Sequence, residues 1–129
     1  MDKKAITDIT LDYLEGWYEG DASRMERALH PDLNKKGLQV IKDTGRSNLS
    51  QASATNMVEA TRAGIGKLKP GEETEIDISV LDIYKNTACV KAVSLRFVDY
   101  CLLARYNDEW KIVNVLWEPR RADDDISGG

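Results

Sequence analysis

The first half of the chain has the apolar spacing of helices. Apolar side chains recur at steps of three and four residues, on one stripe of a helix, at Ile6, Ile9, Tyr13 and Trp17. Asp2 suits the start of this helix as a cap, and Gly20 suits the left-handed position that commonly ends one. The pattern therefore predicts a long N-terminal helix with one apolar face to bury.

Turn and cap residues divide the next part of the chain. Asp21 is placed to cap a short second helix, which Pro31 stops. Residues 33–49 then read as a short strand with a turn. A third helix is predicted over residues 50–63, and the glycine-rich residues 64–73 are expected to form a loop.

The second half alternates apolar and polar residues, as strands do. Every second residue is apolar over residues 75–80, and the phase then shifts at Leu81 and Ile83. Such a shift predicts a bulge and hence a curved sheet. With a further strand over residues 87–97, the chain is expected to form an α+β domain in which N-terminal helices pack on a strongly curved antiparallel sheet.

Residues 99–117 are predicted to form the last hairpin, because Asn107 and Asp108 favour a two-residue turn. Of its two faces, one should pack on the helices, and it carries Asp99, Cys101, Leu103, Ile112 and Asn114. The other face has nothing left in the chain to cover it, and it carries Tyr100, Leu102, Val113, Val115 and Trp117. An uncovered apolar patch usually meets a partner. A symmetric homodimer through this outer sheet face is therefore expected.

Composition narrows the class of protein. A chain of 129 residues with 42% apolar residues is expected to form one domain, over residues 1–121, followed by a disordered charged tail over residues 122–129. The net charge is −4 and the basic residues are scattered, which argues against nucleic-acid binding.

Compartment and metal content follow from a few residues. No apolar run is long enough to span a bilayer, and the start MDKKAITDIT is too polar for a signal peptide, so we expect a cytoplasmic protein with no membrane partner. Cys89 and Cys101 are then expected as free thiols. One histidine and no CxxC pair predict no metal site. The residues do not identify a cofactor.

Two stretches resemble a known family. GWYEGDASRMERALHPDLNKKG and FVDYCLLARYNDEWKIVNVLW, in this order and spacing, are similar to the putative lumazine-binding family of the nuclear-transport-factor-2-like superfamily. The resemblance covers nearly the whole chain. It implies a cone-shaped roll, in which the sheet wraps around the first helix, a pocket inside the cone, and commonly a dimer through the outer sheet. The superfamily includes ketosteroid isomerase, SnoaL-like polyketide cyclases, dehydratases and non-catalytic binding domains, so the resemblance implies no single reaction.

Asp99 and His30 are the candidates for proton transfer. A carboxyl group in an apolar pocket suits a general acid or base, and Asp99 is predicted on the concave face. Alternatively, Asp99 caps the turn at residues 96–98 with Arg96 as its partner. His30 titrates near neutral pH, and the resemblance places its His-Pro pair near the mouth of the cone. Alternatively, His30 caps the last carbonyls of the second helix.

Three further side chains have two readings each. Tyr13 would assist catalysis by analogy with the helix-borne tyrosine of ketosteroid-isomerase-like sites, or it is simply core. Lys35 and Lys36 would meet an anionic ligand, or they are merely solvated.

Three functions follow. The leading hypothesis is a small-molecule-binding protein of unknown ligand, lumazine-like or pterin-like only by family name. Its apolar pocket is predicted to be lined by Tyr13, Trp17, His30, Met57, Cys101, Leu103, Ile112 and Asn114. The alternatives are an isomerase-type or dehydratase-type enzyme that uses Asp99 or His30 with help from Tyr13, and a dimeric interaction module whose cone is filled by side chains.

Overall fold

The structure is a computed structural model that describes residues 2–120, so the predicted disordered tail lies outside the described residues. Its elements follow in the order α1 (Asp2–Glu19), α2 (Ala22–Ala28), β1 (Leu29–Val40), β2 (Ser47–Ala52), α3 (Ala54–Arg62), β3 (Asp77–Tyr84), β4 (Thr87–Val93), β5 (Phe97–Tyr106) and β6 (Glu109–Pro119).

Gly20 and Asp21 act as expected between α1 and α2, whereas Asp2 lies inside α1 and α2 ends at Ala28, before Pro31, which lies in β1. Gly20 follows α1 with φ of 72°, in the left-handed region. The Asp21 side chain accepts a hydrogen bond from the Arg24 backbone N–H and so caps α2. Because Leu29 is already extended, the chain runs from α2 directly into β1.

The predicted start of α3 was wrong by four residues. Ser53 and Asn56 exchange side-chain and backbone hydrogen bonds in a capping box, which fixes the first turn at Ala54. The residues ahead of this cap are free to extend, and they pair with β1 as β2.

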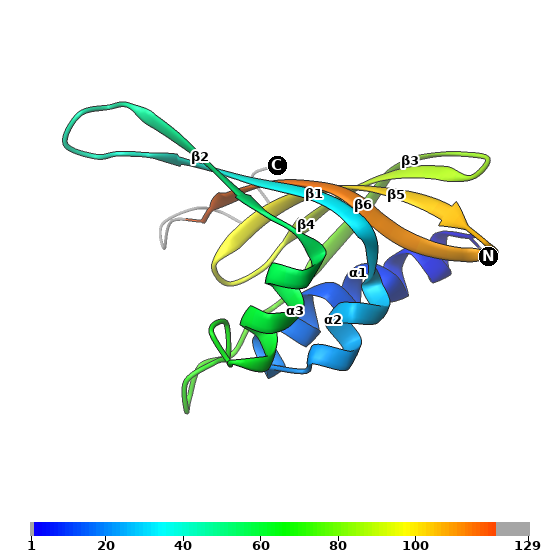
Figure 1. Ribbon diagram of the computed structural model, residues 1–129, viewed down its shortest axis with the longest axis horizontal. Helices are drawn as coiled ribbons and strands as arrows, with labels where there is room; N and C mark the ends of the chain where they lie inside the picture. Colours follow the sequence, from blue (N-terminus) through cyan, green and yellow to red (C-terminus); the bar gives the residue numbers. More distant parts are fainter. Residues whose placement is uncertain (1, 121–129) are drawn as a thin grey trace.

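The six strands form one sheet in the order β2-β1-β6-β5-β4-β3. The α+β class is confirmed, but β1 and β6 run parallel, so the sheet is mixed rather than wholly antiparallel. Figure 1 shows all three helices gathered beneath one face of this curved sheet, with no described helix on the other face. We call the helix-covered side the inner face and the opposite side the outer face. None of the described helices is long and apolar enough to cross a membrane.

Among the described strands, three register shifts interrupt the sheet, and only one was expected; the β1–β6 pairing shifts between Leu29 and Asn34. The register of β3 against β4 shifts between Val80 and Asp82, which confirms the predicted bulge. A second shift lies in the β5–β6 hairpin, where Leu103 pairs with Ile112 but Leu102 pairs with Asn114. Because of this bulge, every later β6 residue lies on the face opposite to the one predicted from regular alternation.

The predicted face assignment of the hairpin was therefore wrong beyond the bulge. Asn114 is exposed, whereas Val115 is 3% exposed and belongs to the core. Trp117 also lies on the inner face, beside Asp99 in the register. Of the five residues expected on the outer face, Tyr100 and Leu102 are about half exposed there, at 46% and 48%.

Candidate functional site

An inner cavity of about 150 Å³ lies between the helices and the sheet. Its walls are mostly apolar, and its lining residues are Tyr13, Leu14, Trp17, Lys35, Ser50, Ala52, Met57, Phe97, Asp99 and Trp117. They come from α1, α3 and four strands, so only the folded chain brings them together.

Strand register builds the sheet side of this cavity. One row of cross-strand partners on the inner face runs from Asp99 through Trp117 and Gly37 to Ser50. The Trp117 ring lies across Gly37, where a Cβ atom would stand only 2.3 Å from it. Glycine at position 37 therefore leaves the room that Trp117 needs to form a flat wall.

The helix side of the cavity is aromatic. Tyr13 and Trp17 stand one turn apart on α1, and both line the cavity. Trp17 packs tightly on Gly66, where a Cβ atom would stand 2.1 Å from the indole. The loop after α3 thus holds Trp17 in place.

Tyr13 links two buried charged groups in the wall. Lys35 Nζ donates to the Tyr13 hydroxyl oxygen at 2.6 Å, and that hydroxyl donates to Asp99 Oδ1 at 3.2 Å. Asp99 is 1% exposed and Lys35 is 9% exposed. The second carboxyl oxygen of Asp99, Oδ2, is buried and has no hydrogen-bond partner among the described residues.

Burial shifts the titration of all three groups. It raises the pKa of Asp99 to about 6, against the opposing effects of the Lys35 charge and the Tyr13 hydrogen bond. Burial lowers the pKa of Lys35, whereas the nearby Asp99 charge acts to raise it. Burial and the Asp99 charge hold the pKa of Tyr13 well above its ordinary value. Tyr13 therefore keeps its proton.

The hydrogen bonds limit what each group can offer a ligand. The single Tyr13 proton is already donated to Asp99, so Tyr13 is not free to donate to an oxyanion in this arrangement. The free Asp99 oxygen can accept an N–H or O–H group. A buried polar atom left without a partner is costly, which favours a ligand that supplies one.

Four predicted pocket or catalytic residues come together at the cavity: Tyr13, Trp17, Met57 and Asp99. Cys101, Leu103 and Ile112 are buried in the core instead, at 1% exposure or less, and do not line the cavity. Asn114 points to the opposite face because of the β6 bulge.

The alternative role considered for Asp99 is contradicted. Arg96 pairs with Glu72, at 2.7 Å between Nη2 and Oε1, and not with Asp99. Asp99 instead points inward to Tyr13.

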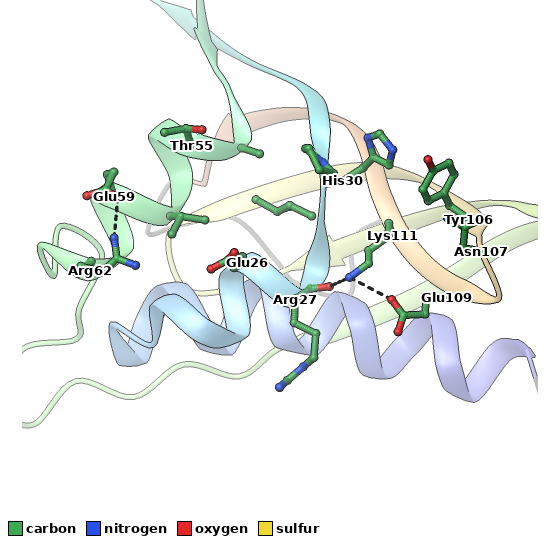
Figure 2. Close-up of a pocket in the computed structure, with 14 residues that line it drawn as sticks. Glu26, Arg27, His30, Thr55, Glu59, Arg62, Tyr106, Asn107, Glu109 and Lys111 are labelled. Carbon is green, nitrogen blue, oxygen red and sulfur yellow. Dashed lines mark hydrogen bonds and ion pairs between the residues drawn. The ribbon is translucent and has the colours of Figure 1, made fainter.

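His30 lies away from the inner cavity. It lines a larger groove of about 670 Å³ between α2, α3 and the β5–β6 hairpin, which we call the hairpin groove (Figure 2). Its Nδ1 accepts from the Asp32 backbone N–H, and its ring meets Tyr106 edge-on at 4.9 Å. His30 stands on β1 rather than at a helix end, so neither the predicted pocket position nor the predicted cap is found.

The charged side chains of the hairpin groove largely form ion pairs with one another. Glu59 pairs with Arg62, and Lys111 pairs with Glu109 while donating to the Arg27 carbonyl (Figure 2). The inner cavity has instead a buried acceptor without a partner. We therefore take the inner cavity as the candidate site.

Six lining residues were absent from the predicted pocket: Leu14, Lys35, Ser50, Ala52, Phe97 and Trp117. Two of them, Lys35 and Trp117, matter most for the chemistry of the site. The signal for Lys35 was present in the alternation of Leu33, Lys35 and Gly37, all three of which are buried on β1. Trp117 gave no comparable signal, because its face depends on the unpredicted bulge. Within residues 2–120, no group of three or more His, Cys, Asp or Glu side chains gathers to hold a metal ion.

Comparison with known proteins adds a family and a fold. The family model described as "Putative lumazine-binding" matches residues 1–118. None of the curated proteins matches the sequence.

Solved structures with the same fold come from several bacteria. An NTF2-like protein of unknown function from Silicibacter pomeroyi has a TM-score of 0.75 at 17% identity, over 92% of this chain and 96% of that one. A second, from Shewanella baltica, has a TM-score of 0.72 at 19% identity, over 94% and 95%. A ketosteroid isomerase-like protein from Erwinia carotovora atroseptica has a TM-score of 0.64 at 12% identity, over 92% and 95%. At such low identities the likeness concerns the fold alone.

Proposed function

The chain belongs to the putative lumazine-binding family, and from this premise we propose that it binds a small, flat, largely apolar molecule in the inner cavity. The observation that carries the proposal is the Asp99 Oδ2 atom, which is buried in the wall of an apolar cavity without a partner among the described residues. A ligand with a ring N–H or O–H group would complete that hydrogen bond.

Cavity size limits the ligand. Drug-sized ligands occupy roughly 300–1,000 Å³, whereas an engineered apolar cavity of about 150 Å³ holds benzene. The inner cavity, also of about 150 Å³, therefore suits a molecule of one ring. A two-ring pteridine, as the family name suggests, has the required ring N–H groups but needs a wall such as Met57 to move.

Two measurements test this proposal. The first is mass spectrometry of small molecules released from the purified, denatured protein, in which we expect a ring compound at about one per chain. The second is a lumazine titration followed by tryptophan fluorescence, since Trp17 and Trp117 both line the cavity. We expect saturable quenching.

Variants of two aspartates identify the acceptor. Asp99→Leu removes the carboxylate and should abolish the quenching, whereas Asp77→Leu removes an exposed carboxylate on β3 and should leave it unchanged. Absence of both a released compound and saturable quenching would contradict the proposal.

A second candidate is proton transfer on a bound carbonyl compound. The observation in its favour is the pKa of Asp99, raised to about 6, which lets this group act as acid or base near neutral pH. The test is deuterium exchange at the carbon beside the carbonyl of a bound ligand, followed by NMR. Asp99→Asn should stop the exchange and leave binding intact. Exchange that persists in this variant would exclude Asp99 as the base.

We further propose that the protein is a homodimer through the outer face. Tyr100, Leu102 and Leu116 are each about half exposed there, on β5 and β6, the two middle strands of the sheet. No described helix lies on this face of the sheet (Figure 1). Such a patch on a small domain is typical of a protein interface.

A reducing compartment suits the two cysteines. Both Cys89 and Cys101 are free thiols, and Cys101 is buried. Thiols persist in the cytoplasm, so we propose that location.

A further inference from the structure

Lys35 is a buried lysine, and lysines are rarely buried unless they are paired. Its side chain enters the inner cavity from β1 and is 9% exposed. It makes no direct ion pair with any described carboxylate, and its one hydrogen bond goes to the Tyr13 hydroxyl. The described residues therefore leave its other two N–H groups without an acceptor.

Aromatic rings surround the amine. Nζ stands 4.9 Å from the centroid of the Tyr13 ring and 5.8 Å from that of Trp117. These rings shield Nζ from water without forming an ion pair. Asp99 stands beyond Tyr13 and is joined to Lys35 through the shared hydroxyl.

We propose that Lys35 captures a small aldehyde or ketone in the inner cavity as an imine, with Asp99 as its proton-transfer partner. The inference rests on the proposed function, since it assigns a substrate class to the same cavity. Lysines that form imines are commonly desolvated in apolar pockets, where the neutral and nucleophilic amine is favoured. Burial lowers the pKa of Lys35 in this sense.

The steps need no additional reagent. The nitrogen lone pair attacks the carbonyl carbon and forms a C–N bond, while the C=O π electrons move to oxygen, which takes up a proton. Nitrogen then loses a proton, which gives a carbinolamine. The hydroxyl group leaves as water after a further protonation, and nitrogen gives up its last proton as C=N is completed. The sum is amine plus carbonyl giving imine plus water.

Asp99 is placed to carry out the proton transfers in these steps. It lines the same cavity, and its free Oδ2 can receive a proton from nitrogen or deliver one to the departing hydroxyl. Its pKa of about 6 makes both forms available near neutral pH.

The test is reductive trapping with benzaldehyde, whose single ring matches the cavity. The whole chain is incubated with benzaldehyde and cyanoborohydride, which reduces an imine to a stable secondary amine, and modified lysines are mapped by peptide mass spectrometry. Lys35 should be labelled at least about tenfold faster than Lys36, because the rate follows the fraction of neutral amine and the local concentration of aldehyde. Lys36 is the next residue on β1 and faces the other side.

Two variants and a second ligand separate the outcomes. Lys35→Arg keeps the charge but cannot form the imine, and it should lose the fast labelling, whereas Lys36→Arg should keep it. Benzyl alcohol has the same ring without a carbonyl, and its binding is read from a rise in Tm.

If Lys35 is labelled no faster than Lys36 while benzyl alcohol still raises Tm, the imine is excluded and the cavity remains a binding site. If Lys35 is not labelled faster and benzyl alcohol does not raise Tm, both the imine and the proposed binding function are contradicted. Because the mapping is done on the wild-type chain, the result does not depend on the variants folding.

Discussion

Asp99 is the residue whose burial should be visible in the stability of the whole protein. Its pKa is 3.8 in an exposed setting and about 6 in the fold, so the folded state binds the proton more tightly than the unfolded state. The stabilisation from this proton is therefore complete below the unfolded value and is lost as pH rises through the folded value.

The expected result is a pH-dependent difference between two proteins. Between about pH 7 and about pH 4, the free energy of unfolding of the wild type should rise by roughly 2 kcal/mol relative to Asp99→Asn, whose amide does not titrate. Urea unfolding at each pH measures this difference. Taking the difference between the two proteins also removes the contributions of acidic groups that both share. Asp12 is one of these: Arg27 lowers its pKa, so Asp12 destabilises the fold as pH falls.

Asp77→Asn is the matched control, since this carboxylate is exposed on β3. It should follow the wild-type pH profile. Identical profiles for wild type and Asp99→Asn would show that Asp99 titrates normally, and proton transfer by this group would lose its support.

Single residues were predictable from the sequence where an alternating pattern fixed their face. Asp99 was expected on the inner face, and Tyr13 and Trp17 on the buried stripe of α1; all three line the cavity. Lys35 was left with two readings, ligand-facing or solvated, because a lysine beside a loop is normally solvated and the alternation on β1 was not used.

At the scale of elements, the close contact between β1 and β6 shapes the cavity wall. The backbone of Gly37 has an ordinary φ, so alanine could adopt it, but its Cβ would stand 2.3 Å from the Trp117 ring. In Gly37→Ala, therefore, Trp117 has to move. We expect a loss of about 1–3 kcal/mol in the free energy of unfolding, as for other overpacked sites.

The same variant should also change the cavity. Moving Trp117 alters its tryptophan emission and weakens ligand quenching, both measured by fluorescence. Gln39→Ala, two residues further along β1 and exposed, should leave emission and stability unchanged. An unaltered spectrum in Gly37→Ala would mean that the strand shifts instead of the ring.

Elements were predictable where local chemistry sets them, and not where strand pairing does. The Asp21 cap, the Asn107–Asp108 turn and the β3 bulge followed from local residues, although the Ser53 cap of α3 was not predicted. Both turn residues have positive φ, at 51° and 65°. The β6 bulge at Val113 left no local sign, because both alternatives place apolar residues on each face. One unpaired residue was enough to move Trp117 into the cavity.

At the scale of the molecule, the class of fold followed from the order of the elements, with all three described helices in the first half and strands alone in the second. The parallel pairing of β1 with β6 could not be predicted, because no local pattern indicates contacts between strands far apart in the sequence. The corrected register leaves the outer face with Tyr100, Leu102 and Leu116, flanked in the pairing by Lys36 and Lys91.

This outer face gives a prediction on assembly. Wild-type protein should sediment as a dimer at micromolar concentration. Leu102→Glu should sediment as a monomer, because the change puts a charged carboxylate into the proposed apolar contact on each subunit. Leu81→Glu, which changes an exposed apolar residue on β3, should stay dimeric. A monomeric wild type would contradict the proposed homodimer.

The same strand carries residues of both the proposed interface and the candidate site. Along β5, Asp99 and Cys101 point inward while Tyr100 and Leu102 point outward, so a contact on one face restrains the side chains on the other. Leu102→Glu does not touch the cavity, yet it should weaken ligand binding if the dimer holds β5 in place. Binding that is unchanged in the monomeric variant would show that each subunit carries a complete and independent site.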